Sequence, residues 1–174
     1  MMMHKVATAF AALLLISGTA SAQGAKLNDA QIAHIAYTAG LADIANAQQA
    51  LKISKNKDVR AFAKDMARDH KAVNDKALAL VKKLKVTPQD NDTSKAIAKG
   101  QADKRVDLAK LKGAAFDKAY INNEVAYHKT VNGALQNTLI PSASNAELKS
   151  LLETGLKIFQ GHQEHAEHVA SEMK

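Results

Sequence analysis

The phrase His-Lys-x-Val-Asn occurs twice in this 174-residue chain, beginning at His70 and again at His128. An imidazole can bind a transition metal, carry a proton or take part in a hydrogen-bonded polar layer. In each copy an asparagine, Asn74 or Asn132, follows the histidine by four residues. Residues four apart lie on one face of a helix, so either amide is placed to orient its imidazole. The repeat therefore marks two matched positions at which we expect chemistry.

Further residues of the right type for a metal site lie elsewhere in the chain. The metal-binding hypothesis combines three histidines with two carboxylates: His70, His128, His162, Asp43 and Glu124. Nitrogen and carboxylate ligands together suit zinc, iron, copper or manganese, so the implied cofactor is a divalent transition metal. Three polar neighbours are expected to support these ligands without binding the metal themselves: Asp69, Asn74 and Asn132.

A second histidine cluster lies near the C-terminus, where His162, His165 and His168 are spaced three residues apart with Glu164 and Glu167 between them. This spacing puts neighbouring imidazoles on adjacent faces of one helix, so His165 and His168 form a secondary surface candidate for a divalent metal. The alternative is a solvated helix end, where the helix dipole favours positive charge.

The histidines also have a purely structural interpretation. A buried imidazole can form a hydrogen-bonded polar layer with Asp, Tyr and Asn neighbours, and no metal is then needed. A catalytic di-iron centre in a helical bundle requires Glu-x-x-His pairs. Here Ala67 stands three residues before His70, and Val125 stands three residues before His128. Ferroxidase chemistry is therefore disfavoured, no catalytic residue is assigned, and we expect a non-catalytic protein.

Helices must position these side chains. Alanine, lysine and leucine dominate the mature chain, which has only two prolines, and this composition predicts an all-α fold. In the second predicted helix apolar residues recur at steps of three and four, and His70 occupies that seam between Met66 and Val73. A capping box over Ser144–Glu147 is expected to begin the last helix. The predicted helices cover residues 29–53, 58–84, 93–111, 114–138 and 144 onward.

The lengths of the connections predict how the helices are arranged. The first two long helices are joined by a short turn, and so are the last two, whereas residues 86–113 can cross the length of the bundle. Two hairpins joined by one long crossover, here carrying a short extra helix, make a ferritin-like four-helix bundle. With a rise of about 1.5 Å per residue, Asp43, His70, His128 and His162 all fall within roughly 6 Å of mid-height. We therefore expect the candidate ligands to converge inside the bundle.

The N-terminal segment has the pattern of a secretory signal. Lys5 precedes an apolar stretch over residues 6–16, and Ala-Ser-Ala at residues 20–22 fits the A-x-A cleavage pattern. We expect residues 1–22 to be removed, which leaves a bundle domain over 28–174 that is exported to the periplasm, secreted or associated with the envelope. The alternative is an uncleaved anchor, but the stretch is shorter than the about 20 residues that span a membrane. After cleavage no membrane span is expected.

Composition narrows the range of partners. The chain has no cysteine, so disulfides and thiolate chemistry are excluded. Removing Lys5 lowers the formal net charge from +7 to +6, an excess that suits anionic partners. Aromatic residues are few and form no basic–aromatic patch, so nucleic acid is not expected. A metal ion, a protein partner and a second copy of the chain remain as candidates.

Three stretches of the sequence resemble one exported bacterial family: DVRAFAKDMARDHKAVND, LKGAAFDKAYINNEVAYHKTV and LKIFQGHQEHAEHVA. The family is domain of unknown function 4142, whose members are similar to ferritin-like bundles. The resemblance runs from about Asn28 to the end of the chain, and the family's motif histidines fall on His70, His128 and His162. It implies a helical bundle and export, and it implies no activity.

The chain departs from this family at two places. Members usually have an acidic residue just before the second histidine, where this chain has Tyr127. They often carry glutamates in the first helix, where this chain offers Asp43 and then Ala45. These departures leave fewer possible ligands than the family pattern implies, and they argue against a two-metal site. Two functions remain open: a periplasmic metal-binding bundle, or an envelope or stress-related interaction module whose histidines form a structural polar layer.

Overall fold

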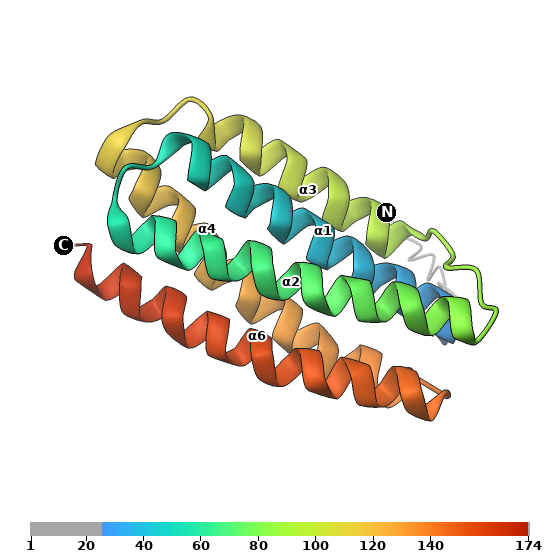
Figure 1. The fold of residues 1–174 in the computed structure, drawn as a ribbon. Coiled ribbons are helices and arrows are strands. Elements are labelled where there is room, and N and C mark those ends of the chain that lie inside the picture. The colour runs from blue at the N-terminus through green and yellow to red at the C-terminus, as the bar shows by residue number, and fades with distance from the viewer. Residues whose placement is uncertain (1–25, 174) are drawn as a thin grey trace, which may run out of the picture.

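The computed structural model describes residues 26–173, which form an all-α bundle without strands (Figure 1). The predicted fold class is confirmed, whereas the predicted signal segment, residues 1–22, lies outside the described residues. Within the described range, no helix is both long and apolar enough to cross a membrane. The helices are α1 Asp29–Ile53, α2 Lys57–Lys83, α3 Asp92–Leu108, α4 Gly113–Ala134, the π-helical η1 Leu135–Leu139, α5 Ile140–Ser142 and α6 Ala146–Glu172.

Asparagine side chains cap the first three helices. Asn28 caps α1, and with Gln31 it forms a reciprocal capping box that satisfies two backbone N–H groups. Asn56 caps α2, and Asn91 caps α3. These caps satisfy amides that the first turn of a helix leaves unpaired, so local sequence defines where these three helices begin.

The capping box predicted over Ser144–Glu147 is wrong by one residue. Asn145 is the cap of α6, because its Oδ1 accepts hydrogen bonds from the N–H groups of Glu147 and Leu148. The backbone N–H groups of Ser144 and Asn145 donate instead to the carboxylate of Asp29, at 2.8 and 2.9 Å. A tertiary contact with the start of α1 therefore decides the start of α6.

The helices pair as two antiparallel hairpins. α1 packs against α2, α4 packs against α6, and α2 and α6 join the two hairpins. The chain crosses between the hairpins through α3, which runs back along α1 and returns the chain to the end of the bundle where α4 begins (Figure 1). This is the ferritin-like arrangement of four helices with one crossover.

The buried core is divided into two apolar clusters. One contains Phe62 and Phe116, and the other contains Ile32, Leu139 and Leu152. Between them, near the middle of the helices, lies a layer of buried polar side chains: Asp43, Asn46, His70, Glu124, His128 and His162. Burying polar groups costs free energy unless they are paired, so this layer needs a compensating interaction.

Gly40 allows α1 and α2 to approach closely beside this layer. A Cβ at this position would lie 2.4 Å from Oδ1 of Asn74, which is buried and donates its amide to the Tyr37 carbonyl at 3.2 Å. We expect Gly40→Ala to lower the free energy of unfolding by about 1–3 kcal/mol, because the new methyl group overpacks this contact. Urea unfolding measures the change. Gly133→Ala, whose Cβ would meet nothing within 4 Å, is the control, and an equal loss in both variants would contradict the argument.

Candidate metal centre

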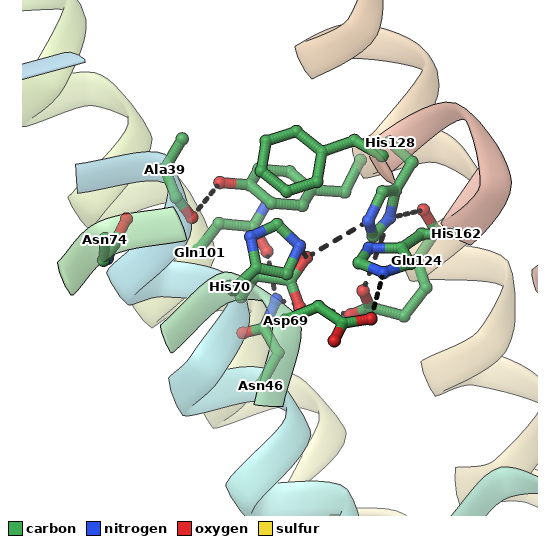
Figure 2. Close-up of polar contacts among 12 residues, drawn as sticks. Ala39, Asn46, Asp69, His70, Asn74, Gln101, Glu124, His128 and His162 are labelled. Carbon is green, nitrogen blue, oxygen red and sulfur yellow. Dashed lines mark hydrogen bonds and ion pairs between the residues drawn. The ribbon is translucent and has the colours of Figure 1, made fainter. Parts of the chain in front are cut away.

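Three imidazoles from three helices meet in the polar layer (Figure 2). His70 comes from α2, His128 from α4 and His162 from α6. Their ring centroids lie 5.7, 5.3 and 5.5 Å apart, and each residue is at most 6% exposed. One nitrogen of each ring lies within 4.8 Å of the others, a spacing that could hold a metal ion. The structure thus brings together the rings that helix rise placed at one level.

Asp43 of α1 faces this cluster from the fourth helix. Its Oδ2 atom lies 3.3 Å from Nε2 of His70 and 3.5 Å from Nε2 of His128. The residue is fully buried, and neither carboxyl oxygen makes a hydrogen bond of acceptable geometry with residues 26–173. Asp43 therefore lies beside two of the three imidazoles, those of His70 and His128.

Glu124 forms a second three-residue group with Asp43 and His128. Its Oε1 atom accepts a long hydrogen bond of 3.4 Å from the Asn46 amide, while Oε2 lies 3.8 Å from Nδ1 of His128. Asn46 also donates to Gln101 of α3 at 2.9 Å, so Asn46 links the crossover helix to this carboxylate. The two groups share His128, which makes that residue the centre of the candidate site.

Hydrogen bonds decide which nitrogen two of the histidines present to the cluster. Nδ1 of His128 lies 3.0 Å from the Glu124 carbonyl, and Nε2 of His162 lies 3.1 Å from Oδ2 of Asp69. A ring nitrogen that faces an oxygen carries the hydrogen, so the lone pair resides on the other nitrogen. Those other atoms, Nε2 of His128 and Nδ1 of His162, are buried and have no hydrogen-bond partner in the described part of the chain. For His70 neither nitrogen has one.

Burial keeps this layer uncharged. Desolvation raises the pKa of Asp43 to about 8, an effect that Glu124 partly opposes, and it raises the pKa of Glu124 well above its usual range. Desolvation likewise lowers the pKa of His128 to about 4 and that of His70 well below its usual value. The pKa of His162 is also lowered by burial, although Asp69 opposes the shift. At neutral pH both carboxyls therefore favour the protonated form, and the imidazoles are neutral ligands.

The supporting residues behave differently from expectation. Asp69 contacts a candidate ligand, but that ligand is His162 of the neighbouring helix rather than the adjacent His70. Asn74 donates to the Tyr37 carbonyl. Asn132 donates to the Phe159 carbonyl and to Gln163, at 3.2 and 3.1 Å. Each amide therefore binds the backbone of an adjacent helix rather than the histidine one turn before it.

The structure separates the members of the C-terminal histidine cluster. His162 points into the bundle, whereas His168 is exposed. His165 is half-buried and packs edge-on against Phe62, with ring centroids 5.2 Å apart. Neither His165 nor His168 belongs to a three-ligand group within residues 26–173.

Aromatic residues around the cluster were not assigned a role from sequence. Phe159 stacks on the ring of His70 at 4.3 Å between centroids, and the Tyr127 hydroxyl donates to the Ala39 carbonyl at 2.9 Å. Tyr120 is fully buried, and desolvation raises its pKa well above the usual value. It lies one helical turn before Glu124, and this four-residue spacing puts both side chains on one face of α4.

The fold and the site together define a class: an all-α bundle with a buried histidine–carboxylate cluster at mid-height. A family model described as Domain of unknown function (DUF4142) matches residues 16–169, so the chain belongs to this family, as the resemblance of its motifs indicated. Comparison with curated proteins and with solved structures gave no match. The family description names no activity, and the function has to be argued from the site.

Proposed function

We propose that this protein is an exported, non-catalytic bundle that binds one divalent transition metal in its polar layer. His70, His128 and His162 would supply nitrogen ligands, Asp43 would supply an oxygen ligand, and Glu124 would complete or adjust the shell. Mixed nitrogen and carboxylate ligands fit zinc and other first-row divalent ions. One ion is expected because the two possible ligand groups share His128.

The unpaired lone pairs of the imidazoles carry this proposal. A purely structural polar layer satisfies its buried atoms with hydrogen bonds. Here Nδ1 of His128 and Nε2 of His162 hold the rings through hydrogen bonds, as in ligating histidines. The other nitrogen of each ring has no hydrogen-bond partner among the described residues. A cation between them offsets the cost of burying these lone pairs, which the apolar clusters on either side cannot do.

The charge state of the layer also favours a cation. Because burial holds protons on the two carboxyls, a divalent ion would displace those protons and bind to oxygens that are otherwise poorly solvated. The histidines need lose no proton, since burial already keeps them neutral. Export, which would bring the domain to the periplasm or the envelope, is supported by the signal pattern of the first 22 residues.

Titration calorimetry with zinc tests the proposal directly. The protein is first treated with a chelator and then titrated with zinc at neutral pH. We expect saturation at one ion per chain and release of protons, which appears as a dependence of the heat on the ionisation enthalpy of the buffer. Elemental analysis of protein purified from its own export compartment identifies the native ion. Failure of zinc, manganese, iron and copper to bind at one-to-one stoichiometry would refute the proposed function.

Bound metal is expected to stabilise the fold. The ligands come from four helices, so unfolding disperses them and only the native state binds the ion tightly. At a free zinc concentration of 100 times the Kd, the free energy of unfolding should rise by about 2.7 kcal/mol. Urea unfolding with and without zinc measures this shift, and added chelator should reverse it. An unchanged midpoint would show that zinc does not bind the folded core.

A further inference from the structure

An apolar cavity adjoins the candidate metal centre. It has a volume of about 60 Å³ and reaches Asp43, His70 and His128. The rest of its wall is built mainly from apolar side chains of α1, α2, α4, η1 and α6, among them Ile35, Val73, Val131, Leu135, Leu152 and Phe159. One end of the cavity therefore presents side chains that can bind a metal, and the rest of its wall carries no charged residue.

The cavity extends from the polar layer toward one end of the bundle. On α1 its lining runs from Asp43 back to Ile35, and on α6 it runs from Phe159 back to Leu151. With a rise of about 1.5 Å per residue, eight residues of α1 span about 12 Å along the bundle axis. On both α1 and α6, this direction leads into the apolar cluster that contains Ile32 and Leu139. The cavity thus extends from the candidate metal centre into this apolar cluster of the core.

Small residues create this space. Gly155 on α6 and Ala36, Ala39 and Gly40 on α1 all line it. A Cβ on Gly155 would stand 3.4 Å from Phe159 and 3.8 Å from Val73, an ordinary contact that a methyl group can fill. Larger side chains at these positions would close the gap, so the absence of side-chain volume on two facing helices keeps it open.

The other two polar groups in the wall each already have a hydrogen-bond partner on α1. The Tyr127 hydroxyl already donates to Ala39, and the Asn74 amide already donates to Tyr37. A buried water needs two to four polar partners, so water is poorly held away from the histidine end. An apolar cavity of about 150 Å³ stays dry and binds benzene or xenon. The smaller volume here fits an apolar molecule of a few heavy atoms but not an acyl chain.

We propose that this cavity binds a small uncharged apolar molecule of dissolved-gas size and holds it beside His70 and His128. Dioxygen and short hydrocarbons share this chemistry. The apolar wall favours their transfer from water, and the unpaired imidazole and carboxyl atoms lie at the end where such a molecule would meet a bound metal. Binding in the cavity requires no metal, so this inference does not depend on the proposed function.

Xenon is the probe for the site. Crystals of chelator-treated protein are pressurised with xenon, and 129Xe NMR follows binding in solution. We expect one xenon site bounded by Val73, Leu152 and Phe159. Gly155→Ala should weaken xenon binding by about tenfold, since its methyl group occupies part of the space. Gly161→Ala, on the same helix with open space around its Cβ, is the matched control and should bind as wild type.

An enlarged cavity gives an independent test. Leu152→Ala should bind xenon more tightly and admit benzene, because truncating a buried leucine leaves added volume. Dioxygen and methane are then compared in the wild type by their effects on methyl NMR signals of the lining. Paramagnetic broadening at those methyls under dioxygen assigns the gas, and shifts under methane alone assign a hydrocarbon. Absence of xenon from the cavity in the wild type, or equal xenon binding in Gly155→Ala and the wild type, would overturn the inference.

Discussion

Replacing His128 with alanine is expected to reduce zinc affinity by more than about 100-fold, a cost larger than the 10–100-fold that loss of a supporting residue brings. His128 belongs to both three-residue groups, so its loss leaves neither group complete. His70 and His162 each belong to one group, and the alanine variants of these residues should lose less affinity. Competition with a chromophoric chelator at neutral pH ranks the three variants.

The controls separate a lost ligand from a lost fold. His168→Ala removes an exposed imidazole from the same helix as His162, and it should leave zinc binding unchanged. Circular dichroism and urea unfolding without zinc show whether His128→Ala retains the bundle. If that variant folds and binds zinc as tightly as wild type, the polar layer is structural and the histidine–carboxylate centre is not a metal site.

Much of this centre could be predicted from the sequence, because the constant rise per residue of a helix gives the height of each side chain along the bundle axis. The seam spacing on the helices around His70 and His128 turns both residues inward, and helix rise puts them level with Asp43 and His162. These two rules need only local periodicity. They accordingly predict the meeting of the four side chains.

Contacts between helices could not be placed in the same way. Asp69 lies on α2 but its carboxylate faces α6, so it pairs with His162 rather than with the neighbouring His70. Which nitrogen of His162 faces inward depends on that pairing, and sequence periodicity says nothing about ring orientation. The network that joins Glu124 through Asn46 to Gln101 depends on how the crossover helix lies along α1. Such contacts follow from tertiary packing alone.

The start of α6 illustrates the same limit. The residues from Ser144 to Glu147 match a capping box, and the match predicts a cap one residue too early. The carboxylate of Asp29, far away in sequence, accepts the N–H groups of Ser144 and Asn145 and leaves the Asn145 side chain to cap the helix. A local motif therefore gives the position of a helix start to within a turn, and a distant partner decides the residue.

Asp43→Asn is expected to change how the stability of the metal-free protein depends on pH. In the fold Asp43 keeps its proton up to a pKa of about 8, whereas in the unfolded chain its ordinary pKa is 3.8. The folded state binds more protons between these values, so the stability from this group is fully present below pH 3.8 and is lost as the pH rises through 8. Asparagine resembles the protonated acid and does not titrate. Between pH 5 and pH 9 the variant should therefore gain about 4 kcal/mol relative to wild type.

The comparison with wild type isolates this carboxyl from the histidines. His128 acts with the opposite sign, because its folded pKa of about 4 lies below the ordinary pKa of 6.5, and its contribution to stability is lost as the pH falls. Both proteins contain His128, so its effect cancels in the difference. Urea unfolding in chelator across this pH range gives the two curves, with Asp75→Asn, whose side chain is 59% exposed, as a surface control. Saturating zinc should reverse the order at alkaline pH, since only the wild type supplies an ionised oxygen to the metal. Parallel curves for wild type and Asp43→Asn would mean that Asp43 is already ionised in the folded core, and the argument from a neutral polar layer would fail.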